Sequence, residues 1–460
     1  MKLWQKNNNN TPSGDGGAVE KFTVGNDREF DLLLAPFDVL GNIAHAKMLA
    51  TVGLLTNEEA TALVEELKAI YKATQKDNNT PLGDGDDNAG FTIHSNIEDV
   101  HSQIEFLLTE KLGDIGKKIH SARSRNDQVL VDLKLFLRHE LEQLVLSIRS
   151  FFELLIQQSE KHKSDLLPGY THLQLAMPSS FGLWFGAYAE SLVDDVTVLQ
   201  SAYKVVNKNP LGSAAGYGSS FPINRTLTTQ LLGFDDLHYN VVYAQMSRGK
   251  TERIVASALA NVADTLARLS IDMCLYLNQN FGFVSFPAEL TTGSSIMPHK
   301  KNPDVFELIR SHCNQVKALP NEIMMMTTNL PSGYHRDLQL LKEHLFPAFT
   351  TLNDCISMAA LMLSNIDVKK DILSDEKYKY LFSVEEVNRL VNEGVPFRDA
   401  YKKIGLDIEA GQFTYSTNVQ HTHEGSIGNL MNDKNASNMQ TAVKSFHFEK
   451  YHAAIEKLLA

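Results

Sequence analysis

The stretch that decides the fold is "KTERIVASALANVADTLARLSIDMCLYLNQNF", residues 250–281. It contains neither proline nor glycine, and its apolar residues recur at spacings of four and three, which places them in one stripe along a helix. The stripe consists of Ile254, Ala258, Val262, Leu266, Leu269, Met273 and Leu277. Because a helix this long exceeds the globular average and needs neighbours to cover its apolar face, the stretch predicts a helix bundle.

Other stretches extend this pattern. Residues 117–167 also lack proline and glycine, and they carry an apolar stripe made of Leu141, Leu144, Ile148, Phe151 and Leu155. A third helical run covers residues 348–393, with a turn expected at "SNIDVKKDILSDEKY", residues 364–378. Strand signals are weak, and the nearest is the short "FGFVSFPAEL" at residues 281–290. The sequence therefore predicts an all-α fold.

The chain divides into three expected parts. An N-terminal helical domain covers residues 1–108, a long central bundle covers 109–363, and a smaller helical C-terminal domain covers 364–460. We find no internal repeat.

Composition excludes several classes of function. The net charge of −12 argues against nucleic acid or an anionic membrane as the main partner, because both require an extended basic face. No apolar run is expected to reach the length of a membrane span. The three cysteines are far apart and have no paired spacing, so we expect buried free thiols and a cytoplasmic location.

Two polar stretches border the first long helix. In "KIHSARSRNDQV", residues 118–129, Arg125 can grip a carboxylate and Asn126 can donate or accept, although Asn126 or Asp127 could simply cap the helix. In "LPGYTHLQLAMPSS", residues 167–180, His172 sits in a turn expected between helices. It could transfer protons near neutral pH, or it could be satisfied by backbone carbonyls.

The strongest local signal is "TTGSSIMPHKKNPDVFELIR", residues 291–310. Gly293 permits unusual backbone angles that let Ser294 project into a site, and Lys300 could stabilise the alkoxide that makes a serine basic. Asn302 adds a neutral donor, and Glu307 could orient a histidine. A flexible Ser/Gly loop would not require the order Met-Pro-His-Lys-Lys-Asn-Pro.

A further stretch, "LPSGYHRDLQLLKE" at residues 330–343, places Tyr334, Gln339 and Lys342 at helical spacings on neighbouring faces. An ordinary helix start with a mixed polar surface is the alternative. His421 and His423 lack a completing cysteine or carboxylate cluster, so no metal site is expected, and there is no phosphate loop or dinucleotide fingerprint.

Together these stretches resemble the fumarase/aspartase superfamily of lyases, whose signature loop is similar to "GSSIMPHKKNP", residues 293–303. Within this superfamily, the chain is similar specifically to the argininosuccinate lyase family. The similarity lies in the companion motifs "SRNDQV", "GYTHLQ", "NPLGSAAG", "GYHRDLQLLKE" and "VPFRDAY". The match runs in order over nearly the whole chain. It implies a three-domain, all-helical homotetramer that cleaves argininosuccinate to arginine and fumarate without metal or organic cofactor.

The resemblance also implies residue roles. Ser294 would abstract the Cβ proton, Lys300 and Asn302 would stabilise the resulting aci-carboxylate, and His172 paired with Glu307 would protonate the departing nitrogen. The substrate would be held by Arg125, Asn126, Thr171, Tyr334, Gln339 and Lys342. Each site would draw on several subunits. His172 acting as the base through water is the alternative assignment.

Some positions depart from the family pattern. The N-terminal "LWQKN" differs, a substrate-binding serine is replaced within "FTVGND", "MSRG" keeps only Arg248, and His299 stands where glutamine is usual. The rival functions are a superfamily lyase acting on adenylosuccinate, fumarate or aspartate, and a structural relative that has lost catalysis.

Overall fold

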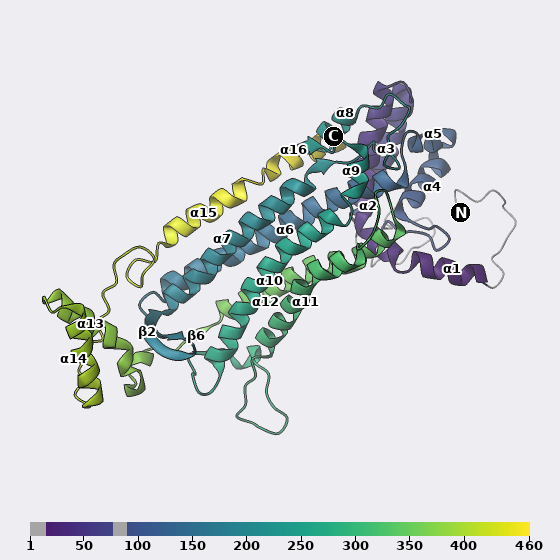
Figure 1. The fold of residues 1–460 in the computed structure, drawn as a ribbon. Coiled ribbons are helices and arrows are strands. Elements are labelled where there is room, and N and C mark those ends of the chain that lie inside the picture. The colour runs from purple at the N-terminus through teal and green to yellow at the C-terminus, as the bar shows by residue number, and fades with distance from the viewer. Residues whose placement is uncertain (1–14, 77–89) are drawn as a thin grey trace.

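A bundle of long helices forms the centre of the molecule (Figure 1). The computed structural model describes residues 15–76 and 90–460. The bundle consists of α6 (Arg125–Lys161), α7 (Phe181–Val206), α10 (Lys250–Leu277), α11 (Asp304–Met326) and α12 (Leu341–Ser364). The prediction of an all-α fold built on long helices is confirmed.

The apolar stripes lie where the spacing predicts. On α10, Ala258, Val262 and Leu266 are buried, and on α6, Leu141, Leu144 and Ile148 are completely enclosed. Both stripes belong to one continuous hydrophobic core that extends through the bundle. The helices thus pack side by side because each buries an apolar face that it cannot cover alone.

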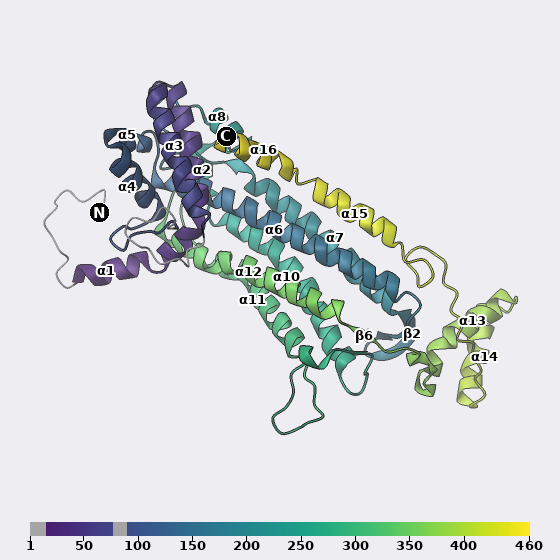
Figure 2. The same cartoon turned by 180° about the vertical axis from the view of Figure 1, so that it is seen from behind.

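The N-terminal helices gather at one end of the bundle (Figures 1 and 2). They are α1 (Asp15–Val24), α2 (Asp27–Thr51), α3 (Asn57–Thr74), α4 (Val100–Leu112), α5 (Asp114–Lys117) and η1 (Lys118–His120). The short helices α8 (Arg225–Leu231), α9 (Val241–Met246) and η3 (Arg336–Leu340) lie in loops that return toward the same end, while η2 (Ala288–Leu290) precedes the signature loop.

The C-terminal helices do not form a single cluster. Beyond the far end of the bundle, α13 (Ser383–Asn392) and α14 (Phe397–Glu409) pack together around Val387, Leu390 and Ala400 (Figure 1). They follow η4 (Ile372–Ser374) and η5 (Glu376–Phe382), which interrupt the third helical run as expected. Then α15 (Asn432–Lys444) and α16 (Phe448–Leu459) run back along the bundle (Figure 2).

A buried cation fixes the returning helix α16. The guanidinium of Arg138 lies between the rings of Phe234 and Tyr451, 4.2 Å and 4.1 Å from their centroids. It also donates to Asn207 Oδ1 over 2.9 Å and to the carbonyl of Leu232 over 2.8 Å. These bonds replace the water that a buried charge loses, so the end of the chain is tied to α6.

Strands are few and short in the described residues. β5 (Val284–Ser285) pairs antiparallel with β6 (Asp367–Val368), which confirms the one weak strand signal. β3 (Lys208–Asn209) pairs parallel with β4 (Asp236–Leu237). The antiparallel hairpin of β1 (Leu166–Thr171) and β2 (Gln174–Ser180) differs from the predicted interhelical turn.

Three helices are long and apolar enough to cross a membrane by length and composition alone: Asp27–Thr51, Lys250–Leu277 and Arg336–Ser364. The expectation that no apolar run has this length was therefore wrong. Their most apolar windows are 78%, 61% and 50% buried inside the protein, respectively. At least half of each window is therefore buried, where its apolar residues form packing surfaces of the fold.

The cysteines are free thiols, as expected. Cys313 and Cys355 are buried in the facing helices α11 and α12, whereas Cys274 is half-buried on α10.

Candidate active site

A cavity of about 240 Å³ opens where α2, α4, α6 and η3 meet. It is lined by Asp27, Asp31, Glu98, Asp99, His101, Arg125, Asn126, Val129, Arg248, Tyr334, Arg336, Gln339 and Lys342. Five of the predicted substrate-binding residues are therefore together, although they come from segments more than 200 residues apart in the sequence.

The start of α6 presents Arg125 and Asn126 to this cavity. The N-cap is Ser124 and Asp127 completes a capping box, so the alternative role as a helix cap holds in part for Asp127 and not for Asn126. Asp127 also accepts from the backbone N–H groups of Gly212 (2.9 Å) and Ala214 (3.0 Å). In this motif Asp127 has a structural role, whereas its neighbours Arg125 and Asn126 line the cavity.

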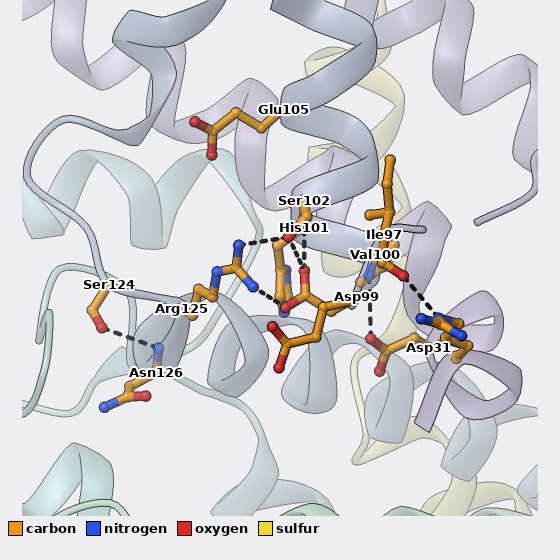
Figure 3. Close-up of polar contacts among 12 residues, drawn as sticks. Asp31, Ile97, Asp99, Val100, His101, Ser102, Glu105, Ser124, Arg125 and Asn126 are labelled. Carbon is orange, nitrogen blue, oxygen red and sulfur yellow. Dashed lines mark hydrogen bonds and ion pairs between the residues drawn. The ribbon is translucent and has the colours of Figure 1, made fainter. Parts of the chain in front are cut away.

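Arg125 is held by the N-terminus of α4 (Figure 3). Its guanidinium forms an ion pair with Asp99 and donates to Ser102 Oγ over 2.5 Å. Asp99 is the N-cap of α4 and accepts from the Ser102 backbone N–H over 2.8 Å. The side-chain amide of Asn126, in contrast, has no hydrogen-bond partner within residues 15–76 and 90–460, which leaves it available to a ligand.

Lys342 is buried on the opposite side of the cavity, with its Nζ 2.5 Å from both Asp27 and Asp31. Burial and the nearby charge of Asp31 raise the pKa of Asp27 to about 6. Burial alone would lower the pKa of Lys342, but the two carboxylates outweigh it and raise that pKa. Asp27 ends the "FTVGND" segment, where the family's serine is replaced.

Tyr334, Gln339 and Lys342 were expected at helical spacings on neighbouring faces, but Tyr334 precedes the 3-10 helix η3, Gln339 lies on η3 and only Lys342 lies on α12. A hydrogen bond to the N-terminal segment holds this region in place, because Gln339 Nε2 donates to the carbonyl of Thr23 over 3.0 Å. Arg248 Nη2 donates to the carbonyl of Leu338 over 2.7 Å, and its Nε donates to Glu252 over 2.8 Å. Arg248 thereby connects the start of α10 to the segment that carries Tyr334 and Gln339.

The remaining predicted residues lie at the other end of the bundle. Thr171 and His172 lie at the tip of the β1–β2 hairpin, where His172 and Leu173 have positive φ angles of 55° and 57°. Such angles at both central residues are those of a tight hairpin turn, which sequence periodicity could not reveal because neither residue is glycine. His172 is exposed.

The signature loop also projects from that end (Figure 1). Its base is closed by a bridge between Thr292 and Asn302, and Ser294 Oγ accepts from the backbone N–H of Met297 over 3.1 Å. Lys300 and Glu307 are exposed. In the described part of the chain, no hydrogen bond or ion pair joins Glu307, in the first turn of α11, to His172 at the hairpin tip.

The length of α6 separates the two groups. At about 1.5 Å per residue, a helix of 37 residues is about 55 Å long. Arg125 begins this helix, whereas the hairpin that carries His172 follows its end. His172 therefore lies the length of α6 away from Arg125, and the loop with Ser294 and Lys300 follows the end of α10.

Several cavity residues were missed by motif reasoning, namely Asp27, Asp31, Glu98, Asp99, His101 and Arg336. A usable signal existed for some of them. Asp31 and Asp38 lie seven residues apart within the apolar run "FDLLLAPFDVL", so they share one face of α2. Charged residues on an otherwise buried face indicate a polar site.

Comparison with known proteins gives consistent matches. The model of a family described as Lyase matches residues 18–318. The argininosuccinate lyase of Bacteroides fragilis is 58% identical over 459 residues, covering 100% of this chain and 99% of that relative. The argininosuccinate lyase of Thermotoga neapolitana is 36% identical over 406 residues, covering 88% of this chain and 97% of that relative.

Solved structures share the fold. An EDDS lyase in complex with formate has a TM-score of 0.73 at 20% identity, covering 95% of this chain and 94% of that one. A class II fumarase from Schistosoma mansoni has a TM-score of 0.67 at 17% identity, covering 92% and 94%.

Proposed function

The chain belongs to the Lyase family and, within it, to the argininosuccinate lyases, and from this premise we propose how its residues divide the reaction. It is a carbon–nitrogen lyase of arginine biosynthesis that eliminates arginine from argininosuccinate and leaves fumarate. The proposed division of roles among these residues rests on one observation. A single cavity is lined by Arg125, Asn126, Tyr334, Gln339 and Lys342.

The cavity suits a substrate that carries both carboxylates and cationic groups. Its cations are already paired with carboxylates, as in Arg125 with Asp99 and Lys342 with Asp31. A substrate carboxylate can exchange with one of these partners without leaving a buried charge unpaired, which is the costly alternative. Thr171 is proposed to complete this binding set from the hairpin of a neighbouring subunit.

The proposed chemistry is a β-elimination carried out by side chains of the protein. Ser294 takes the proton from Cβ of the succinyl part, and the electron pair moves into the adjacent carboxylate to form an aci-carboxylate. Lys300 and Asn302 stabilise the added charge, where preorganised donors have their largest effect. The carbon–nitrogen bond then breaks, and His172, oriented by Glu307, protonates the departing guanidino nitrogen.

We propose that a homotetramer builds each site from more than one subunit. The length of α6 supports this, because about 55 Å of helix separates Arg125 at the cavity from the end of α6 that the His172 hairpin follows in the same chain. Apolar side chains also remain exposed on the central helices, including Leu308 (60%), Met325 (64%) and Leu361 (45%). Exposed apolar patches of this kind indicate association.

Mixing two inactive variants tests the shared site. His172→Asn and Ser294→Ala are unfolded together and reassembled in equal amounts. If separate subunits supply positions 172 and 294, each position is wild type half the time, so about a quarter of the sites should regain activity. Fumarate release by the mixed tetramers measures this fraction. A mixture no more active than its parents, with mixed tetramers confirmed, would reject the arrangement.

The substrate assignment is tested by fumarate release, followed by ultraviolet absorbance. We expect argininosuccinate to be cleaved, and expect no comparable turnover of adenylosuccinate or aspartate and no hydration of fumarate. Faster turnover of any of these would favour a different lyase of the superfamily. No turnover of any substrate by correctly assembled protein would favour the structural relative.

The location is proposed to be cytoplasmic, in keeping with three free cysteines and no expected need for disulfides.

A further inference from the structure

A buried histidine that belongs to none of the motifs lines the substrate cavity. His101 lies in the first turn of α4 and is only 8% exposed. Its Nδ1 is 2.8 Å from Asp38 Oδ1 and 3.6 Å from Asp132 Oδ2. The imidazole therefore stands between the cavity and a pair of carboxyl groups deeper in the protein.

Asp38 fixes the orientation of this ring. One of its carboxylate oxygens bonds His101, and the other accepts from Asn42 Nδ2 over 2.9 Å. Asn42 is anchored in turn by donating to the backbone carbonyl of Asp38 over 2.8 Å. Because Nδ1 is committed to Asp38, Nε2 is the ring nitrogen that remains for a ligand: His101 lines the cavity, and its Nε2 has no hydrogen-bond partner in the described residues.

Asp132 completes the support behind the histidine. It is fully buried, and neither carboxyl oxygen has a hydrogen-bond partner in the part of the chain that the structure describes. Burial, followed by the charge of Asp38, raises the pKa of Asp132 well above its usual range, which favours the neutral acid. Burial alone would lower the pKa of His101, but Asp38 outweighs it and raises that pKa, which favours the imidazolium.

A bound cation is the competing use of these groups, whose potential ligand atoms lie within 4.8 Å of one another. Two observations oppose it. Asp38 and His101 already bond directly over 2.8 Å. The guanidinium of Arg123, which is partly buried, lies close enough to Asp38 and Asp132 to interact with their charges, so the carboxyl pair already has a permanent cation in its surroundings.

The pairing of the other cavity cations gives His101 its distinct position. Arg125 pairs with Asp99, Lys342 with Asp27 and Asp31, Arg336 with Glu98, and Arg248 with Glu252. Within residues 15–76 and 90–460, His101 lines the same cavity but differs from these cations, because its Nε2 is bound by no carboxylate.

We propose that His101 is a further substrate-binding residue, which donates from Nε2 to the α-carboxylate of the arginine half of the substrate, while Asp38 and Asp132 orient its ring. This inference rests on the proposed function. The amino-acid end of the arginine half carries one ammonium and one carboxylate, which matches a cavity lined by both signs of charge. The fumarate half instead carries two carboxylates and is assigned to the loop with Lys300.

The test compares the binding of the two products, arginine and fumarate, to the full-length assembled enzyme by titration calorimetry. In His101→Asn, the amide can still donate to Asp38 from the place of Nδ1, but nothing occupies the place of Nε2. We expect arginine to bind roughly tenfold to a hundredfold more weakly, the scale of a lost hydrogen bond to a charged group. Fumarate binding should change less than about twofold, and KM for argininosuccinate should rise more than kcat falls.

Matched variants separate recognition from folding. His101→Gln places an amide nitrogen near the position of Nε2 and should restore part of the arginine affinity. Asp38→Asn removes the carboxylate that orients the ring and should weaken arginine binding.

Wild-type arginine affinity in His101→Asn, or equal weakening of arginine and fumarate, would overturn the proposal. If His101→Asn fails to assemble, the same two criteria apply to Asp38→Asn. Failure of the proposed function is a separate result, because it would appear as wild-type protein that releases no fumarate from argininosuccinate.

Discussion

Replacing Ser294 by alanine should leave the protein folded and lower kcat for argininosuccinate by roughly a hundredfold or more, the scale of a lost general base. A hundredfold loss corresponds to about 2.7 kcal/mol of activation free energy. The physical reason is that no other loop group is proposed to take the Cβ proton, and Ser294 lies on a projecting loop whose base is closed by the Thr292–Asn302 bridge. Steady-state fumarate release measures the effect.

Ser295→Ala is the matched control for this prediction. Ser295 is the next residue in the loop and is exposed, so its loss should change kcat little. Ser294 Oγ accepts from two backbone N–H groups, of Ile296 and Met297, and the variant loses these local bonds as well. Thermal unfolding and substrate binding by Ser294→Ala should therefore be compared with wild type. Retention of more than a tenth of wild-type kcat would show that Ser294 is not the base.

Replacing Lys300 by methionine should reduce turnover on a similar scale, roughly a hundredfold to a thousandfold, because the aci-carboxylate loses its principal cation. Methionine keeps much of the length of lysine while removing its charge. Nitro analogues that mimic the carbanion should lose affinity by a comparable factor, since they resemble the transition state more than the substrate does. Inhibition constants for such analogues and kcat test the prediction together.

Lys301→Met provides the comparison for Lys300. Both lysines are exposed on the same loop, so the two changes remove equal charge from nearly the same place. We expect Lys301→Met to be far milder, because adjacent side chains in a loop point in different directions. Equal losses at both positions would indicate that the loop needs only positive charge, and the role given to Lys300 would be wrong.

Much of the helical architecture could be predicted from the sequence. Apolar residues on α6 and α10 recur with the helical period, and proline and glycine are absent from both, so local information was sufficient for these elements. The β1–β2 hairpin could not be predicted in this way. Its turn places His172 and Leu173 in left-handed backbone conformations that non-glycine residues rarely adopt, and tertiary context overrides that preference.

The site was predictable as a set of motifs but not as an arrangement. Tyr334, Gln339 and Lys342 were recognisable beside one another in the sequence, and the structure places them at a cavity with Arg125 and Asn126. The residues missed there, such as Asp99 and His101, lie in no recognised motif. Their importance depends on burial and on partners from other helices, which a single sequence does not display.

The sequence by itself determined the long helices, the signature loop and the membership in a lyase family, because periodicity and motifs are properties of neighbouring residues. The tertiary structure decided which motifs meet. The 37 residues of α6 hold Arg125 and the His172 hairpin at opposite ends, so these two motifs do not meet within one chain. The structure also placed His101 against Asp38 and Asp132, since only packing brings α2, α4 and α6 to one buried point where unpaired charge is costly.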